Sequence, residues 1–170
     1  MVIHLTLIPF LSATGELKTK PTQHSVKTLM ELGLKADVLV CRSERDLSDE
    51  VKKKLALFCN VKLDCVIQSI DVETIYDVPM KMRDEGLDKV TLEKLKIDES
   101  EPNLDKWKNF LHRLKNPTHQ ISIGLVGKYV ELNDSYKSIL ESLIHGGTEN
   151  EVKVNVKSIH SEYLLSLIHI

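Results

Sequence analysis

The sequence predicts an α/β fold in which a parallel sheet is flanked by helices, and two observations lead to this class. Apolar runs of strand length alternate with helix-length segments that carry an apolar stripe, first over residues 2–69 and again after residue 119. The 170 residues are 42% hydrophobic and 28% charged, a globular composition that can bury a core. Strand-helix-strand runs imply right-handed crossovers and therefore parallel strands.

Three strands and a first helix are expected in the first half of the chain. The predicted strands are "VIHLTLI" (2–8), "ADVLVC" (36–41) and "DCVIQS" (64–69). The first helix is predicted over residues 22–33. Val26, Leu29 and Met30 fall on one face of it, and Gly33 can end it in the left-handed conformation.

A second helix is predicted over residues 48–59. Ser48 is a good N-cap, and the two carboxylates that follow it suit the positive end of the helix dipole. Val51, Leu55 and Phe58 mark its apolar stripe. Ligands of such sheets collect at the carboxyl ends of the strands, which is where the stretch "GELKTKPTQHSV" follows the first strand.

Charge and cysteine content exclude several classes of protein. Lys and Arg number 23 against 25 Asp and Glu, a net charge of -2, so no overall basic field draws the chain to nucleic acid or to an anionic membrane surface. Cys41, Cys59 and Cys65 have neither CxxC pairing nor histidines at metal-ligand spacing, which favours buried reduced thiols in a reducing compartment. The opening apolar run is shorter than the about 20 residues of a membrane span. A cytoplasmic protein is expected.

The quoted stretch combines cations, hydroxyls and an amide at the start of a predicted helix. Its candidate donors are Lys18, Lys20, Thr19, Thr22 and Gln23, with Glu16 as the one carboxylate in the loop. Such donors beside the free N–H groups of a helix start suit a polyphosphate. Lys54 lies four residues before Phe58, so a cation and an aromatic ring share a face of the second helix. The alternative is a solvated rim of lysines, and spacing alone does not decide between the two.

Several stretches together resemble the CTP synthase family, the glutamine-dependent amidoligases that convert UTP to CTP. They are "HLTLIPFLSATGELKTKPTQHSV", "VLVCRSER", "LALFCNV" and "IGLVGKYVELNDSYKS", and the resemblance is collinear from residue 2 to about residue 164. It implies a Rossmann-like, P-loop-like amidoligase portion followed by the first β-α-β part of a class I glutaminase domain. It further implies a C–N-forming ligase of pyrimidine nucleotide biosynthesis, with ATP and Mg²⁺ as cofactors and a homotetramer as the intact assembly. Its ligands would be UTP, ATP, glutamine, the activator GTP and the inhibitor CTP.

The resemblance also implies roles for individual residues. The triphosphate of UTP or CTP would be bound by Lys18, Thr19, Lys20, Pro21, Thr22 and Gln23, and Lys54 would be another contact of the same nucleotide. The adenine of ATP would lie against Ile70, Asp71 and Val72, where only the backbone role of Ile70 transfers because some relatives carry a basic residue there. Arg42 and Phe58 are weaker candidates for packing on a base in the same region. Lys137 would contact GTP, with Lys128 and Tyr129 nearby.

The expected organisation follows from the same resemblance. Residues 1–98 would be the C-terminal part of the synthetase domain, 99–119 an interdomain helix and linker, and 120–164 the start of the glutamine amidotransferase domain. The ATP loop and the acidic magnesium ligands are expected ahead of residue 1, and the glutaminase Cys, His and Glu beyond residue 170. We therefore assign no catalytic and no metal-binding residue, and we expect the chain alone to make no CTP. Residues 165–170, "LSLIHI", read as a translated sequencing adaptor.

Two other functions compete with this interpretation. One is a regulatory or scaffolding CTP synthase homologue that binds nucleotides without turnover. The other is an unrelated doubly wound module such as a small kinase-like ATPase, which the sequence disfavours. The near miss "GLVGKY" has Ser122 where a phosphate-binding loop needs Gly and Tyr129 where it needs Ser or Thr.

Overall fold

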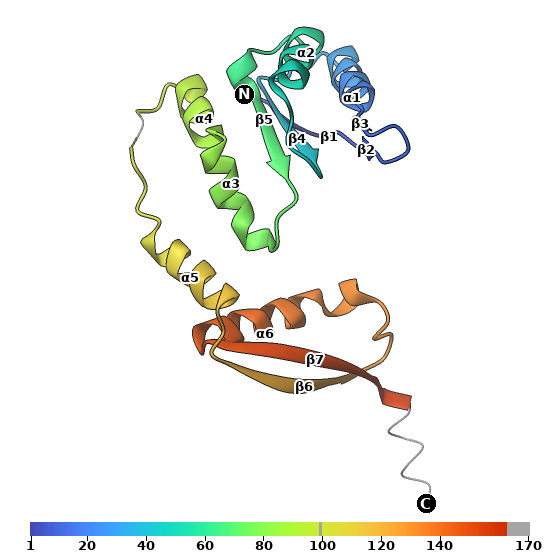
Figure 1. Cartoon of the computed structure of the whole chain (residues 1–170), viewed down its shortest axis with the longest axis vertical. Coiled ribbons are helices and arrows are strands. Elements are labelled where there is room, and N and C mark those ends of the chain that lie inside the picture. The colour runs from blue at the N-terminus through green and yellow to red at the C-terminus, as the bar shows by residue number, and fades with distance from the viewer. Residues whose placement is uncertain (99, 163–170) are drawn as a thin grey trace, which may run out of the picture. The chain divides into compact units, whose positions relative to one another are not determined.

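The computed structural model describes residues 1–98 and 100–162, and the chain divides into two compact units, Met1–Glu101 and Pro102–Ile170 (Figure 1). The adaptor-like tail predicted at 165–170 lies outside the described residues. None of the helices in the described part of the chain is long and apolar enough to cross a membrane.

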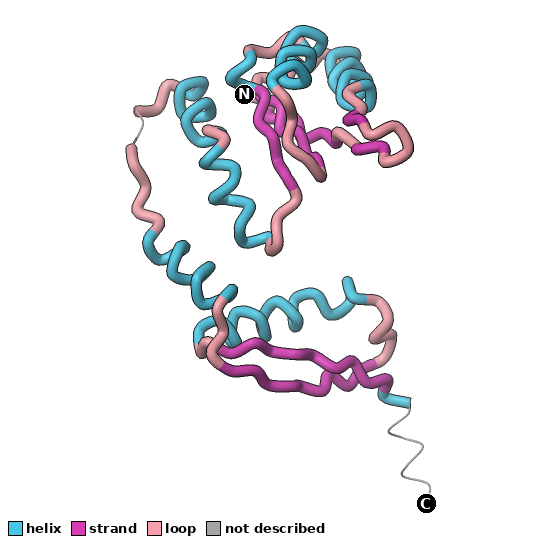
Figure 2. Tube along the Cα trace, in the orientation of Figure 1, coloured by secondary structure: helices cyan, strands magenta, loops and turns pink. Residues whose placement is uncertain are grey.

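Unit 1 is built on a parallel sheet of three strands, in the order β1-β4-β5 (Figure 2). The strands are β1 (Ile3–Leu7), β4 (Val38–Ser43) and β5 (Val66–Ile70). All three predicted strands are confirmed, with bounds that differ by one or two residues. The last begins late because the 3-10 turn η1 (Leu63–Cys65) occupies its predicted start.

Two helices, α1 (Lys20–Glu31) and α2 (Asp49–Cys59), pack on one face of this sheet. Both predicted helices are confirmed, but part of each predicted stripe is wrong. Met30 is 48% exposed and Phe58 is 62% exposed. On α2 the buried pair is Leu55 and Cys59, four residues apart, so Phe58 is turned away from the sheet.

The opposite face is covered by α3 (Val78–Asp84) and α4 (Leu87–Leu95), which follow the 3-10 turn η2 (Ile75–Asp77). Their side chains Met82, Leu87 and Val90 pack on a cluster that includes Val38 and Val40. Strand β4 is therefore buried on both faces, which explains its unbroken apolar run. On the edge strand β1, the side chains that share this second face are exposed: Ile3, Leu5 and Leu7.

A short antiparallel hairpin between β1 and α1 was not predicted. Its strands are β2 (Phe10–Leu11) and β3 (Glu16–Leu17). Gly15 makes the turn with a φ of 68°, and its N–H donates to the carbonyl of Leu11 over 2.8 Å. The N–H of Lys18 donates to the carbonyl of Pro9 over 2.9 Å, so the backbone is held at both ends of β3.

The predicted local signals of the two helices are confirmed. The Ser48 hydroxyl accepts from the N–H of Val51 and caps α2. Gly33, at a φ of 78°, follows the end of α1 in the left-handed conformation. The three cysteines are free and buried, as predicted.

Unit 2 contains α5 (Asp105–Lys115), β6 (His119–Gly127), η3 (Asn133–Tyr136), α6 (Lys137–Glu149) and β7 (Val152–His160). Strands β6 and β7 are parallel, so the predicted strand-helix-strand pattern is confirmed. Helix α6 lies against the sheet at Gly147, where a Cβ would meet the carbonyl oxygen of Val152 at 2.5 Å. Helix α5 contacts α6 through the rings of Phe110 and His145, whose centroids are 6.1 Å apart.

Candidate functional site

The N-terminus of α1 has backbone donors that its own side chains leave available. Thr19 is the N-cap residue, yet its hydroxyl makes no capping bond and instead accepts from Nε2 of Gln23 over 3.1 Å. The first turn contains no acidic residue, and Pro21 brings no N–H. Because a helix start carries partial positive charge, this terminus favours an anion.

The residues of the "KTKPTQ" stretch differ in their environments. Lys20 is exposed, whereas Lys18 is half-buried and forms an ion pair with Glu16. Thr22 is fully buried, and its hydroxyl donates to the carbonyl of Leu7 over 3.1 Å. A contact from Thr22 to a ligand would therefore have to come from its backbone N–H.

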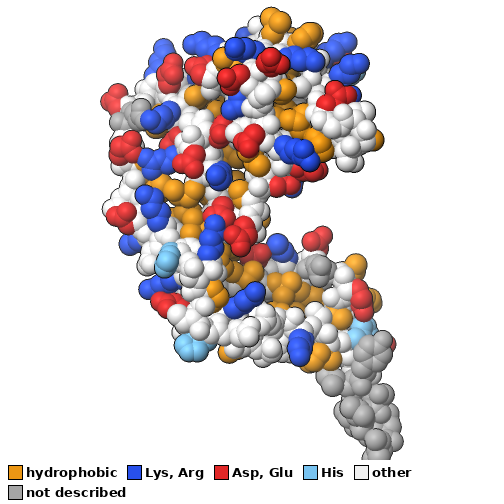
Figure 3. All heavy atoms as spheres, viewed as in Figure 1, with side chains coloured by type: hydrophobic (Ala, Val, Ile, Leu, Met, Phe, Trp, Pro, Cys, Tyr) orange, Lys and Arg blue, Asp and Glu red, His pale blue; other side chains and the backbone are white. Residues whose placement is uncertain are grey.

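A hollow of about 470 Å³ lies between the hairpin and the start of α2, and we call it the hairpin hollow. Glu16, Thr19, Arg45 and Lys54 are among the side chains that line it. The fold thus brings Thr19 and Lys54, which the sequence analysis assigned to one ligand, to the same hollow. Figure 3 shows that basic and acidic side chains are interspersed over the visible surface of unit 1, without a field of one sign.

Arg45 is a lining residue that sequence reasoning missed. Its guanidinium carbon lies 3.6 Å from the centroid of the Phe10 ring, a cation–π contact that ties the hairpin to the loop ahead of α2. The signal available in the sequence was the second arginine of "CRSER", two residues after the strand that ends at Ser43.

Like Asp46 and Glu50, Glu16 is a carboxylate that lines the hairpin hollow. The ammonium of Lys18 donates to it and lowers its pKa from the ordinary value of 4.5, with smaller contributions from Thr14 and from the charge of Lys54. Glu16 is therefore ionised at neutral pH beside the candidate anion ligands.

Gln23 and Phe58 line a different hollow, of about 380 Å³. Val26 and Met30 of α1 are also in its wall, and the exposed ring of Phe58 forms one side. An apolar wall beside an amide is suited to a flat base rather than to a phosphate.

A groove of about 640 Å³ runs over the second face of the sheet, and we call it the sheet groove. It is lined by Ile70, Asp71 and Val72, the predicted adenine segment, and by Arg42. Nε of Arg42 donates to Oδ1 of Asp71 over 3.2 Å. Arg42 and Phe58, which the sequence analysis placed in one region, therefore line different hollows.

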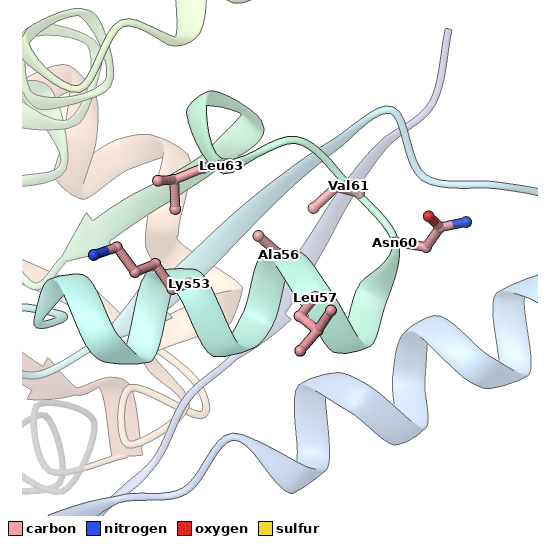
Figure 4. A pocket seen from close by; sticks show the side chains of 6 residues that line it. All are labelled: Lys53, Ala56, Leu57, Asn60, Val61 and Leu63. Carbon is pink, nitrogen blue, oxygen red and sulfur yellow. The ribbon is translucent and has the colours of Figure 1, made fainter.

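A further hollow, of about 440 Å³, contains none of the predicted residues (Figure 4). It lies beside the C-terminal half of α2 and is lined by Lys53, Ala56, Leu57, Asn60, Val61 and Leu63. Its walls are mainly aliphatic, and Figure 4 shows the side chains of Lys53 and Asn60 pointing away from each other. The hollow has no convergent polar groups with which to bind a ligand.

In unit 2 the residues predicted near GTP lie on the segment that leads from β6 into α6. Lys137 begins α6, and its ammonium lies 3.0 Å from a carboxylate oxygen of Glu141. The Tyr136 hydroxyl donates to the carbonyl of Lys128 over 2.5 Å and closes the loop. Tyr129 is exposed, in a left-handed conformation with a φ of 57°.

The metal-ligating residue types and the thiols of the described part of the chain were compared with what a metal site or a reactive thiol needs. Residues 1–98 and 100–162 contain no group of three or more His, Cys, Asp or Glu side chains that could hold a metal ion. Burial raises the pKa of the Cys41 thiol to about 11, and it also raises the pKa of Cys59 and Cys65.

Comparison with known proteins gives consistent relatives. Residues 1–97 match the family model described as CTP synthase N-terminus. The CTP synthase of Christiangramia forsetii is 69% identical over 165 residues, which are 96% of this chain and 30% of that protein. The CTP synthases of Methanocaldococcus jannaschii and Aquifex aeolicus are each 51% identical, over 98% and 96% of this chain and 31% of each relative. The chain thus spans about three-tenths of the length of these curated relatives.

Proposed function

The chain belongs to the CTP synthase family, and from this premise we propose that it is a segment of an enzyme that aminates UTP to CTP with ATP and with ammonia from glutamine. In this proposal the segment binds, orients and regulates, and other parts of the enzyme supply the reacting phosphate and the ammonia. The observation that carries the proposal is the hairpin hollow, where Thr19 and Lys54 meet beside the Glu16–Lys18 pair.

The triphosphate of UTP is the ligand proposed for the start of α1. Its ligands would be Lys18, Thr19, Lys20, Pro21, Thr22, Gln23 and Lys54. Free N–H groups, two exposed or half-exposed ammonium groups and the absence of a carboxylate in the first turn of α1 support this. CTP carries the same triphosphate, so it would compete for the same contacts. Phe58, beside Gln23, would pack on the base of the inhibitor.

The adenine of ATP is proposed to lie in the sheet groove against Ile70, Asp71 and Val72. The groove is mainly apolar, which suits a purine ring, and the Arg42–Asp71 pair would hold the segment after β5 in place. In this proposal Arg42 acts through its ion pair with Asp71 of the adenine segment.

The reaction proposed for the whole enzyme has two steps. ATP phosphorylates the 4-oxygen of the uracil, and ammonia then displaces that phosphate at the same carbon. The residues of this chain transfer no proton; they hold UTP so that its base meets the ATP phosphate, which is catalysis by positioning and by charge. Magnesium would neutralise the phosphates of ATP, but the described residues do not fit a magnesium site, so its ligands would lie outside them.

Unit 2 is proposed to begin the glutamine amidotransferase domain, with residues 99–119 as the linker and 120–162 as the described part of its first β-α-β unit. The relatives match almost the whole chain, which supports one continuous protein across both units. Lys137 would contact the activator GTP. A homotetramer in the cytoplasm, without nucleic acid or membrane as partner, completes the proposal.

A nucleotide-binding regulatory or scaffolding homologue without turnover is the alternative. A chimera separates the two, in which residues 1–162 of this chain replace the matching stretch of the Christiangramia forsetii CTP synthase. The proposal predicts CTP formation from UTP, ATP and ammonium by the chimera, and none by the 170-residue chain alone. Binding of UTP without CTP formation by a folded chimera would favour the alternative.

A further inference from the structure

Glu16 has an environment that the proposed function does not use. It lies on β3, where it pairs with Leu11, and the turn at Gly15 and the Lys18–Pro9 backbone bond fix its position. Lys18 directly follows β3, two residues after Glu16. The ammonium of Lys18 forms an ion pair with the carboxylate of Glu16.

The same carboxylate lines the hairpin hollow together with Lys54. It lies within the electrostatic influence of both lysines, since each lowers its pKa. The side chain of Glu16 is 54% exposed and that of Lys18 is 37% exposed, so both remain accessible to a ligand. The Arg45–Phe10 contact holds the hairpin, and with it Glu16, against this hollow.

We propose that Glu16 lowers the affinity of the triphosphate site for nucleotides. Its carboxylate pairs with the Lys18 ammonium when no nucleotide is bound, and an incoming phosphate must displace the carboxylate from that ammonium. This inference rests on the proposed function, because it needs Lys18 as a phosphate ligand. The carboxylate costs binding energy in two ways. It holds a cation that the ligand needs, and it repels the anionic ligand across the hollow.

If Glu16 only supported the fold, its substitution would affect nucleotide binding in the opposite direction. Loss of a structural ion pair would loosen the hairpin and weaken nucleotide binding or leave it unchanged. Loss of a competing carboxylate would strengthen binding. The sign of the effect therefore distinguishes the two roles, and UTP and CTP should respond in parallel because they share the triphosphate.

The test is Glu16→Gln in the chimera, assayed by steady-state CTP formation. We expect the UTP half-saturation and the CTP inhibition constant to fall about two- to fivefold, the range that the strength of an exposed ion pair allows. The ATP half-saturation should stay the same, since the sheet groove does not include Glu16. Glu31→Gln is the matched control, because it removes another exposed Lys–Glu pair, with Lys27, from the far end of α1.

A double-mutant cycle completes the test. In a Lys18→Ala background, most of the gain from Glu16→Gln should disappear, because no ammonium is left to release. Unchanged or weaker UTP binding in Glu16→Gln, or an equal gain without Lys18, would overturn the inference and leave the proposed function intact. A folded parent chimera that forms no CTP would instead contradict the proposed function and remove the basis of this inference.

Discussion

Nε2 of Gln68 donates to a carboxylate oxygen of Glu85 over 2.8 Å, and this bond ties β5 to the end of α3. The other oxygen of Glu85 accepts from Nζ of Lys52 on α2 over 3.2 Å. Oε1 of Gln68 accepts from the N–H of Leu47, in the loop ahead of α2. These bonds connect the two helical layers of unit 1 around the edge strand β5.

Glu85→Ala is expected to destabilise unit 1 by about 1–2 kcal/mol, because a half-buried amide and an ammonium lose their acceptor. Hydrogen exchange of the β5 amides in the 170-residue chain measures this. Glu93→Ala, at an exposed position on α4, is the control and should have little effect. Equal protection of β5 in both variants would show that the Glu85 network adds no stability.

Gly147→Ala and Gly146→Ala should change the stability of unit 2 in opposite directions. A Cβ at Gly147 would meet the carbonyl oxygen of Val152 at 2.5 Å, so this change should cost about 1–3 kcal/mol. A Cβ at Gly146 meets nothing within 4 Å, and alanine there should stabilise α6 by about 0.5–1 kcal/mol. Trp107, the single tryptophan, lies on α5 and reports unfolding of unit 2 in urea. Equal urea midpoints for the two glycine variants would contradict the close packing of α6 on β7.

The cysteines should resist alkylation in the native chain. Burial raises the pKa of Cys41 to about 11, so its reactive thiolate is scarce near neutral pH and becomes common only above that value. Iodoacetamide labelling followed by mass spectrometry should modify Cys41 slowly in buffer and rapidly in urea. Rapid native labelling at neutral pH would mean that the sheet opens at β4.

The fold was predictable where the signal is local and less so where it depends on packing. Gly33 and Ser48 mark helix ends through their own chemistry, and both predictions hold. Periodicity could not tell that Cys59, and not Phe58, faces the sheet, because both positions lie near the edge of the stripe. The hairpin was not predicted because its strands have two residues each, too few for an alternating pattern.

The candidate site was also predictable only in its local features. The lysines and hydroxyls of the loop are visible in the sequence, but burial of Thr22 is not, since it depends on the approach of β1. Arg45 joins the hairpin hollow only because Phe10 lies beneath its guanidinium, a contact across 35 residues of chain. The roles of these residues toward nucleotides stay predictions.

Lys137→Ala in the chimera should weaken the stimulation by GTP of glutamine-dependent CTP formation. Synthesis from free ammonia should stay nearly unchanged, because the proposed contact acts only on the glutaminase side. Glu141→Gln, which removes the partner of Lys137 and keeps the lysine, is the companion variant and should retain stimulation. Equal loss of both activities in Lys137→Ala would indicate a folding defect in place of a GTP contact.

The UTP half-saturation of the chimera with Lys18→Ala or Lys20→Ala tests the central claim most directly. Each charge-assisted contact to phosphate is worth roughly 1.5–3 kcal/mol, so the half-saturation should rise about tenfold or more. CTP inhibition should weaken in parallel, and the ATP half-saturation should change less. Lys35→Ala, an exposed lysine beyond the other end of α1, is the control and should leave all three values as they are. Lysine variants at 18 and 20 with unchanged UTP saturation would contradict the account and identify the stretch as a solvated rim.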